Sequence, residues 1–411
     1  MVPKVGIDVA SVERIAAAYN RFRDRFLRKF LTDREIAYCE QRPERWAGRW
    51  AAKEAIGKAL PSGVHRPRMV DVEILPQPDG RPRVWVIPGT ALTGRSIDVS
   101  IAHDGRFAIA VAAISVPGSV TISGEFPQGF RLPDRPRDGH KGTFGTVVIL
   151  AGSQGFTGAA YLASAGATRV GAGLVRLLVA QSIYPILAEK CTEVMVAPVP
   201  EVAPGTVGHV SLEALLRGFA GADAGVVGPG LGRDPSTWRL LEDALPRVGV
   251  PIVLDADGLN LLAEHKADLA RLPQEFVLTP HPVEFARLSG IEPAAVQADR
   301  VGVARRFAKS WRKVVVLKGA HTVIAAPDGG LTVNSAATPV LASGGTGDVL
   351  AGVIAGLLAQ GLSAFEAAVT GVHIHGLAGE ELEQEIGSSG VLASELLTAI
   401  PRVMQGIRAA T

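Results

Sequence analysis

A glycine-rich segment followed by an aspartate carries the clearest chemical signal of this chain. Residues 343–348 read Ser-Gly-Gly-Thr-Gly-Asp, and an apolar run over residues 349–359 follows. Glycines at the start of a helix leave backbone N–H groups open to an anion, such as a phosphoryl group in transfer. In the first turn of that helix, Asp348 is placed to take the proton of a hydroxyl that becomes phosphorylated. Taken alone, the segment also fits a glycine-rich turn with an ordinary N-terminal aspartate.

Polar clusters follow the predicted buried strands of the second half, which cover residues 147–150, 226–227, 252–254, 277–278 and 314–317. In an open parallel sheet the carboxyl ends of all strands lie along one edge, where ligands bind. Glycines and prolines that merely end strands would not explain the polar residues at matching positions. These residues are Asp255, Asp257, Asn260, His281, Glu284 and Lys318. The pattern predicts a nucleotide-sized cleft.

The two common nucleotide fingerprints are not found where they would be expected. The first strand–helix turn has glycines at 152, 155 and 158, which is not G-x-G-x-x-G, and no G-x-x-x-x-G-K-[ST] occurs. The phosphate site is therefore expected at the loop before Asp348, as in ribokinase-type folds rather than in P-loop enzymes.

The first 115 residues contain a second candidate site. Asp8 follows a short apolar stretch, and Glu54 lies in a predicted helix one turn before Lys58. Two carboxylates can hold Mg²⁺ while water and phosphate oxygens complete its shell, and nearby Lys and Arg can bind other phosphates. From spacing alone, Glu54 and Lys58 also fit a surface ion pair. His103 ends a predicted strand, and it fits either an acid/base or phosphate contact or a structural histidine.

Charge and glycine are distributed unevenly along the 411 residues. Residues 1–115 carry 19 Lys and Arg against 13 Asp and Glu, a net charge of +6, whereas the remainder has a net charge of −4. Of the 47 glycines, 8 precede residue 116. A chain of this length is expected to form two or more domains. The contrast indicates a basic small domain with an acidic or phosphorylated partner.

The pattern of predicted elements gives the same division. Residues 1–115 contain a strand (4–9), helices over 13–26 and 45–60, and four further strands, which predicts a small α+β domain. A stretch rich in Pro and Gly follows, and we assign residues 116–130 to a linker. Residues 131–411 alternate β-branched runs with helical patterns, which predicts an α/β domain with a mostly parallel sheet.

Cysteines and apolar runs bear on the compartment. Cys39 and Cys191 lie in different halves and at no metal-ligand spacing, so neither a disulfide framework nor a zinc site is predicted. Asp8 and Glu13 fall where a signal peptide needs its apolar core. The apolar run over 349–359 is shorter than the about 20 residues that span a bilayer. We expect a cytoplasmic protein with no membrane and no nucleic-acid partner.

Four ordered motifs in residues 1–115 resemble the holo-acyl-carrier-protein synthases, a family of 4′-phosphopantetheinyl transferases. They are G-I-D-V-A-S-V-E-R-I from residue 6, F-L-T-D-R-E from 30, A-G-R-W-A-A-K-E-A-I-G-K-A-L from 47 and S-I-A-H from 100. The resemblance implies Mg²⁺-dependent transfer of 4′-phosphopantetheine from coenzyme A to a serine of an acyl carrier protein, a step of fatty acid biosynthesis. It implies that Asp8 and Glu54 hold Mg²⁺ and are catalytic together with His103. It further implies coenzyme A contacts from Arg49, Lys53, Lys58 and His103.

The same resemblance gives a reason for an arginine-rich helix. Carrier proteins are acidic, so Arg14, Arg21 and Arg25 are expected to steer and orient the carrier protein. A solvated basic face is the alternative. Because members of this family form trimers with the site between subunits, we expect a homo-oligomer, a trimer or higher. A docking and oligomerisation module without transfer activity is the alternative for the whole domain.

A second ordered set of motifs, over about residues 131–405, resembles the ribokinase-like ADP/ATP-dependent NAD(P)H-hydrate dehydratases. It includes K-G-T-F-G from 141, G-P-G-L-G from 228, D-A-D-G-L-N from 255, H-P-V-E from 281 and L-K-G-A-H-T from 317. This family restores NAD(P)H from its hydrated form, NAD(P)HX, at the expense of a nucleotide phosphate. The resemblance implies that NAD(P)HX is bound by Gly158, Ala159, Gly230, His281 and the catalytic Asp348. It implies that the nucleotide is bound by Lys318, Gly319, Ala320, His321, Thr322, Gly344, Gly345, Thr346 and Gly347.

The implied chemistry fits these residues. The hydroxyl of the hydrate is a poor leaving group, and phosphorylation makes it a good one before elimination restores the dihydropyridine ring. Asp348 would deprotonate the hydroxyl, and the amides of residues 344–347 would stabilise the transferring phosphoryl group. Bacterial relatives tend to use ADP and eukaryotic relatives ATP, and this sequence resembles the former. A kinase for a small vitamin-like alcohol shares the glycine-rich loop and is the alternative.

Two positions depart from the pattern of that family. Val340 ends an Ala-Thr-Pro-Val segment where Gly-Asn-Pro-Gly is usual, and Val283 stands where His-Pro-Gly-Glu is usual. Both replace glycine with a β-branched residue, which disfavours positive φ. We expect the loop shape to differ at these two positions, more than the reaction class.

Overall fold

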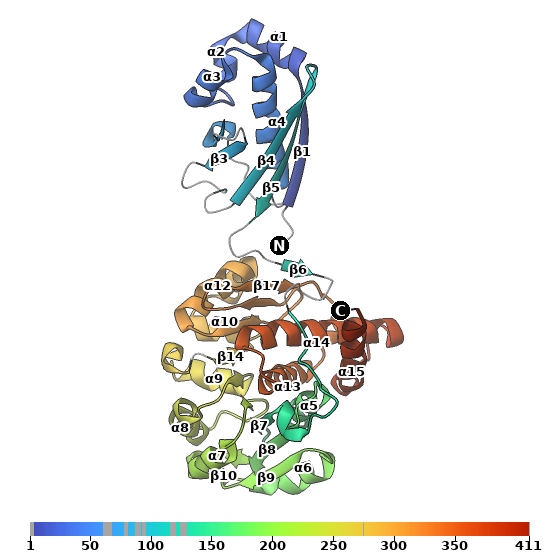
Figure 1. The fold of residues 1–411 in the computed structure, drawn as a ribbon. Helices are drawn as coiled ribbons and strands as arrows, with labels where there is room; N and C mark the ends of the chain where they lie inside the picture. The colour runs from blue at the N-terminus through green and yellow to red at the C-terminus, as the bar shows by residue number, and fades with distance from the viewer. Residues whose placement is uncertain are drawn as a thin grey trace. The chain divides into compact units, whose positions relative to one another are not determined.

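The computed structural model describes residues 4–60, 68–77, 81–86, 92, 96–115, 121–123, 130–273 and 275–410. The chain divides into two compact units, Met1–Ser119 and Val120–Thr411 (Figure 1). Of the predicted linker, residues 116–120 and 124–129 lie outside the described residues. The predicted fold class is confirmed, because the first unit mixes helices with an antiparallel sheet and the second has a mostly parallel one.

In the first unit, a three-stranded antiparallel sheet packs against one long helix. Its elements are β1 (Lys4–Ser11), α1 (Val12–Phe22), α2 (Asp24–Leu27), α3 (Asp33–Cys39), α4 (Pro43–Ala59), β2 (Val72–Pro76), β3 (Pro82–Val86), β4 (Ser96–His103) and β5 (Phe107–Ser115). The sheet has the order β1-β5-β4, and α4 packs on β1 and β5. A Cβ on Gly6 of β1 would lie 2.1 Å from the carbonyl oxygen of Ala55. This close approach keeps Asp8, on the same strand face, beside α4.

The helices of this unit differ from the prediction in two respects. The helix expected over 13–26 is two helices, because Arg23 has a positive φ of 49° and ends α1. Helix α3 was not predicted. It begins with a capping box, in which the Thr32 side chain accepts from the Glu35 N–H and the Glu35 carboxylate accepts from the Thr32 N–H.

The second unit is built on one large sheet. Among the described residues it contains the strands β6 (Thr121–Ser123), β7 (Thr146–Leu150), β8 (Leu174–Ala180), β9 (Met195–Val199), β12 (Ala224–Val227), β13 (Ile252–Leu254), β14 (Val277–Leu278), β15 (Val314–Leu317), β16 (Val323–Ala325) and β17 (Leu331–Asn334). Their order is β6-β17-β16-β15-β14-β13-β12-β7-β8-β9. All pairings from β15 to β9 are parallel, and β10 (Glu201–Ala203) and β11 (Thr206–Val207) form a separate hairpin. The five predicted strands are therefore neighbours, and their carboxyl ends share one edge.

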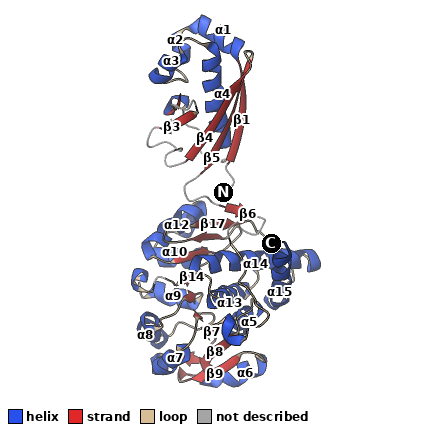
Figure 2. Cartoon of the chain, viewed as in Figure 1, coloured by secondary structure: helices blue, strands red, loops and turns tan. Residues whose placement is uncertain are grey.

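Helices cover both faces of this sheet (Figures 1 and 2). They are α5 (Thr157–Arg169), α6 (Tyr184–Lys190), α7 (Leu212–Phe219), α8 (Pro235–Ala244), α9 (Asp257–Glu264), α10 (Pro282–Ser289), α11 (Pro293–Ala298), α12 (Arg300–Trp311), α13 (Thr346–Ala359), α14 (Ala364–Ile386) and α15 (Ala393–Ala410). Helix α13 contacts β7, β12 and β13 and lies between α5 and α14. It is buried nearly all round, which explains why its sequence is an uninterrupted apolar run.

Glycines allow α13 and α5 to approach closely. A Cβ on Gly352 would lie 1.9 Å from the carbonyl oxygen of Ala163, and one on Gly166 would lie 2.6 Å from that of Val349. Asp348 lies in the first turn of α13. The close contact between α13 and α5 therefore fixes the position of this aspartate relative to the sheet.

Replacing Gly352 by alanine is expected to destabilise the second unit by about 1–3 kcal/mol, because the two helices must separate to admit the methyl group. Gly406→Ala in α15 is the matched control, since its Cβ would meet nothing within 4 Å. Alanine there is expected to stabilise by about 0.5–1 kcal/mol. Urea unfolding of both variants measures the difference. A Gly352→Ala midpoint at or above the wild-type value would contradict the packing described.

Candidate active sites

The predicted phosphate loop of the second unit is held in a defined shape. Gly345 has a left-handed φ of 93° and forms the N-cap of α13, which places Asp348 in the first helical turn. The Thr346 hydroxyl lies 2.9 Å from the carbonyl oxygens of both Leu341 and Ser343. From α14, Nε2 of the buried His375 lies 2.9 Å from the Thr346 carbonyl oxygen, so the ring donates there. These bonds fix the direction in which the first N–H groups of α13 point.

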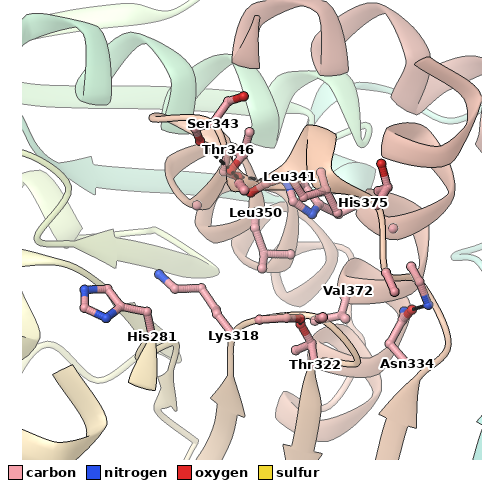
Figure 3. Close-up of a pocket in the computed structure, with 18 of the residues that line it drawn as sticks. His281, Lys318, Thr322, Asn334, Leu341, Ser343, Thr346, Leu350, Val372 and His375 are labelled. Atoms are coloured by element: carbon pink, nitrogen blue, oxygen red, sulfur yellow. Dashed lines mark hydrogen bonds between the residues drawn. The ribbon is translucent and has the colours of Figure 1, made fainter. Parts of the chain in front are cut away.

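A cavity of about 660 Å³ opens beside this loop (Figure 3). Apolar side chains from the loop, α13 and α14 form one part of its wall, namely Leu341, Leu350 and Val372. The predicted nucleotide-site residues that line it are Lys318, Gly319, Ala320, Thr322, Gly344, Thr346 and Gly347. Its size and mixed lining suit a nucleotide. His321, Gly345 and Asp348 are not among its described lining residues; Asp348 follows directly on the lining residue Gly347.

The residues expected to bind NAD(P)HX are divided between two places. Gly158 and Ala159 open α5, and a Cβ on Gly230, which has a φ of 59°, would lie 3.0 Å from Cβ of Ala159. The phosphate loop touches the same helix, because a Cβ on Gly345 would lie 2.5 Å from Leu162. His281 instead lines the 660 Å³ cavity together with the nucleotide-site residues. The loop that precedes Asp348 therefore borders the cavity and also contacts α5.

Neighbouring strand ends supply a buried polar network. Nζ of Lys318, which follows β15, lies 2.6 Å from Oδ1 of Asp255, which follows β13. The hydroxyl of Thr279, which follows β14, donates to the same oxygen over 2.8 Å. Asp255 and Thr279 are each 1% exposed. The strand-end pattern predicted both Asp255 and Lys318 at the cleft but gave a binding role only to Lys318, and it left out Thr279 and His375. Strand-end position could have identified Thr279, whereas nothing local in the sequence marks His375.

This environment changes the proton affinity of the candidate base. Burial raises the pKa of Asp348 to about 7. The carboxylates of Asp255 and Asp257 raise it as well, and the Lys318 ammonium opposes them. A carboxylate with a pKa near neutrality is suited to take a proton and return it.

His281 and Glu284 form the capping box at the start of α10, and the Lys318 charge acts on both of them. Burial raises the pKa of Glu284 to about 7, against the Lys318 ammonium. Burial lowers the pKa of His281, and Lys318 adds to this effect. Nδ1 of His281 accepts from the backbone N–H groups of Val283 and Glu284, so the neutral ring carries its proton on Nε2. Nε2 of His281 lies 3.4 Å from Oε1 of Glu284, and the ring lines the cavity.

The two valines that depart from the family pattern fit their positions. Val283 lies in the first turn of α10, and Val340 lies buried in a short 3₁₀ helix (Pro339–Ala342). Neither is among the described residues with positive φ. A β-branched residue is therefore unstrained at both positions.

In the first unit, Asp8 and Lys58 form an ion pair between β1 and α4. Nζ of Lys58 lies 2.7 Å from Oδ1 of Asp8 and 3.2 Å from the Ile7 carbonyl oxygen. Glu54, half-buried one turn before Lys58, lines a small depression with Arg68. His103 is exposed at the end of β4, which lies beyond β5 from Asp8. The predicted carrier-protein residues Arg14, Arg21 and Arg25 are all exposed.

Two predicted coenzyme A contacts instead lie in the core of this unit. The Lys53 side chain is 1% exposed, and its Nζ lies 2.6 Å from Oε2 of Glu35 and from the Phe30 carbonyl oxygen. Arg49 is 7% exposed, with its guanidinium 4.5 Å from the centre of the Tyr38 ring. Both cations are thus buried beside α3, and Nε of Arg49 has no hydrogen-bond partner among the described residues. Their contact with coenzyme A stays a prediction.

In the part of the chain that the structure describes, no cluster of three or more His, Cys, Asp or Glu side chains has the arrangement of a metal site. No helix there combines the length and apolar character needed to cross a bilayer.

Comparison with known proteins gives a family-model match for each unit. Residues 147–402 match the NAD(P)H-hydrate dehydratase family model, and residues 4–112 match that of the 4′-phosphopantetheinyl transferase superfamily. The chain is 41% identical over 330 residues to a bifunctional NAD(P)H-hydrate repair enzyme of Moorella thermoacetica, covering 78% of this chain and 60% of that protein. It thus spans less than two thirds of that relative's length.

Two shorter proteins match the second unit over most of their length. An ADP-dependent (S)-NAD(P)H-hydrate dehydratase of Xanthomonas campestris is 39% identical over 65% of this chain and 90% of its own. The structure of the Bacillus subtilis ADP/ATP-dependent dehydratase, co-crystallised with ATP and Mg²⁺, superposes with a TM-score of 0.57. It is 31% identical and covers 67% of this chain and 94% of its own.

Proposed function

Because the chain belongs to the NAD(P)H-hydrate dehydratase family over residues 147–402, we propose that its second unit converts (S)-NAD(P)HX to NAD(P)H, with ADP or ATP as phosphoryl donor. The observation that carries this proposal is the position of Asp348. It stands in the first turn of α13, directly after a glycine loop that borders a nucleotide-sized cavity and contacts α5. A phosphoryl donor in the cavity and a hydroxyl acceptor can therefore meet beside this carboxylate.

The proposed reaction has two steps. First, the hydroxyl oxygen of the hydrate bonds to the terminal phosphorus of the nucleotide, the phosphorus–oxygen bond to the leaving nucleotide breaks, and Asp348 takes the hydroxyl proton. The loop amides stabilise the charge on the transferring group. Next, the carbon–oxygen bond breaks, its electron pair leaves with phosphate, and the neighbouring carbon loses a proton. The products are NAD(P)H, phosphate, and AMP from ADP or ADP from ATP.

The fate of the phosphorus separates this reaction from the kinase alternative. Phosphorus NMR of a reaction with (S)-NADHX and ADP is expected to show inorganic phosphate equal to the NADH formed. A stable phosphomonoester without NADH would show that the second unit is a kinase for this hydroxyl.

For the first unit, we propose transfer of 4′-phosphopantetheine from coenzyme A to an acyl carrier protein, in accord with the superfamily match over residues 4–112. Asp8 and Glu54 come from adjacent elements, and two carboxylates are the donor set that Mg²⁺ uses when phosphate oxygens complete its shell. Bound there, Mg²⁺ would neutralise pyrophosphate charge. Lys58 lies beside Asp8 to contact a phosphate, and the exposed Arg14, Arg21 and Arg25 offer an acidic carrier a basic surface.

Mass spectrometry of an apo carrier protein incubated with coenzyme A and Mg²⁺ tests this transfer. The carrier is expected to gain one phosphopantetheine, and Glu54→Gln is expected to lose this activity while the dehydratase activity remains. A folded wild-type protein that modifies no carrier and binds no coenzyme A would support the docking-module alternative. We place both activities in the cytoplasm.

We propose that the first unit also forms a homo-oligomer, in accord with one apolar face of its sheet. On β1 and β5 the residues pointing away from α4 are 37–56% exposed; they are Val5, Ile7, Val9, Phe107, Ile109 and Val111. Contiguous exposed apolar side chains of this kind mark protein interfaces.

Replacing Ile7 by glutamate is expected to dissociate the oligomer into monomers, because a carboxylate would be buried in an apolar interface. Light scattering after size-exclusion chromatography gives the mass of each species. A wild-type protein that is monomeric at micromolar concentration would contradict the assignment of this face.

A further inference from the structure

The buried network between the strand ends of the second unit bears on the reaction itself. Adjacent parallel strands β13, β14 and β15 end in Asp255, Thr279 and Lys318. Oδ1 of Asp255 accepts from both other side chains, over 2.8 Å from the Thr279 hydroxyl and 2.6 Å from Nζ of Lys318. The Asp255 side chain is 2% exposed, whereas that of Lys318 is 18% exposed. Lys318 therefore reaches the cavity surface, and its partner does not.

The ammonium lies directly next to the phosphate loop. A Cβ on Gly347 would lie 3.3 Å from Nζ of Lys318 and 4.0 Å from Oδ2 of Asp255. Both Gly347 and Lys318 line the 660 Å³ cavity, and Figure 3 shows the lysine extending along its wall. An ammonium group has three N–H donors, of which one is directed at Asp255. The remaining donors are available to an anion seated against the Gly347 amide.

Resting on the proposed function, we propose that Lys318 is a catalytic residue whose ammonium contacts the transferring phosphoryl group, and that Asp255 and Thr279 are positioning residues that aim it. In the transfer step, the hydroxyl oxygen forms a bond to phosphorus while the bond to the nucleotide's bridging oxygen breaks. The electron pair of the broken bond stays on the nucleotide, and the hydroxyl proton goes to Asp348. Lys318 stabilises the non-bridging oxygens, which carry charge in the transition state.

The charges around Asp348 make this role measurable. The groups that act on it are Asp255 after β13, Asp257 at the start of α9, and Lys318 after β15. Glu284 of α10 acts on Lys318, and the buried His375 of α14 has a pKa lowered to about 4 by burial and stays neutral. Burial lowers the pKa of Lys318, but Asp255 and Glu284 outweigh it, so the lysine remains charged. Lys318 is the cation among these groups.

Three variants test the proposal in the full chain, with the rate of NADH formation from (S)-NADHX and ADP as readout. Lys318→Met is expected to lower kcat by about 10²–10³-fold, the usual effect of removing one preorganised stabilising donor. Its KM for NADHX is expected to stay within about threefold of wild type, because the lost contact forms with the phosphoryl group. Lys309→Met, on the exposed face of α12, is the matched control and should behave as wild type.

The double variant Asp255→Asn/Lys318→Met separates catalysis from charge balance. If Lys318 served only to compensate the buried Asp255 carboxylate, removing both charges would restore near wild-type kcat. If it contacts the phosphoryl group, the double variant stays as slow as Lys318→Met. Thermal unfolding of each variant establishes that the slow proteins are folded. If Lys318→Met alone unfolds, the double variant, which lacks both buried charges, is compared with the wild type instead.

The pH profile provides an independent readout. Asp348 must be ionised to act, so kcat/KM falls on the acid side of its pKa. Lys318→Met removes a positive neighbour and should move this acid limb to higher pH. Asp255→Asn removes a negative neighbour and should move it to lower pH. Limbs that shift in the same direction, or not at all, would overturn the proposal.

Failure of this proposal can be told from failure of the proposed function. Wild-type protein that forms no NADH with either nucleotide refutes the dehydratase assignment. Wild-type protein that forms NADH, together with a folded Lys318→Met variant of equal kcat, refutes only the role of Lys318.

Discussion

Replacing Asp348 by asparagine is expected to lower kcat for NADHX dehydration by about 10²–10⁴-fold, the range for loss of a general base. Asparagine has nearly the same shape, so the loop that Gly345, Thr346 and His375 hold in place should persist. What is lost is the acceptor for the hydroxyl proton. Steady-state assays under saturating ADP measure the change. The exposed Asp134→Asn is the control and should match wild type.

The pH dependence of the wild type belongs to the same prediction. A base is active when deprotonated, and burial with nearby carboxylates raises the pKa of Asp348 to about 7. Activity should therefore fall as pH decreases through about 7. An aspartate at its ordinary pKa of about 3.9 would leave the rate flat to about pH 5. A flat profile together with an active Asp348→Asn variant would exclude Asp348 as the base.

Replacing Lys53 by methionine is expected to destabilise the first unit by about 3–5 kcal/mol, the effect of breaking a buried ion pair from one side. Glu35 is 0% exposed and accepts from Nζ of Lys53 and from the backbone N–H groups of Thr32 and Ile74. Without Lys53 the carboxylate would stay buried beside neutral donors only. Urea unfolding followed by tryptophan fluorescence is suitable, because Trp46 and Trp50 belong to α4.

Two controls are available for this prediction, one in each unit. NADH formation by the second unit should be unchanged in Lys53→Met, and the exposed Lys29→Met should leave the unfolding midpoint unchanged. Adding Glu35→Met to Lys53→Met should restore part of the loss, since an apolar pair of similar volume replaces the buried charge. A midpoint for Lys53→Met equal to wild type would show that the ion pair contributes nothing to this unit.

The sequence predicted the arrangement of the second unit in some detail. Parallel strands place their carboxyl ends on one edge whatever their order, so the clusters after β13, β14 and β15 could be grouped before any coordinates were known. The glycine loop could also be recognised from the sequence, because glycines followed directly by an apolar run indicate the start of a buried helix. Contacts between distant segments could not be predicted in this way. His375 reaches Thr346 from 29 positions away, and no periodicity reports that contact.

The burial of Lys53 could not be predicted, for a specific reason. Spacing along α4 shows which residues share a helix face, but not what that face packs against. The partner of Lys53 is Glu35 in α3, a short helix that was not predicted. The coenzyme A contact of Lys53 was implied by the family resemblance, not by this spacing. Asp8 and Lys58 were both predicted as site residues, and their direct ion pair depends on the register of β1 against α4, which only the folded chain shows.

The central claim is that the second unit dehydrates NAD(P)HX at the expense of a nucleotide. It is tested most directly by mixing the purified full chain with (S)-NADHX and Mg²⁺, adding ADP or ATP in parallel, and following NADH absorbance. The account predicts nucleotide-dependent recovery of NADH by the wild type, with ADP the better donor, and almost none by Asp348→Asn. Folded wild-type protein that recovers no NADH with either nucleotide would contradict it.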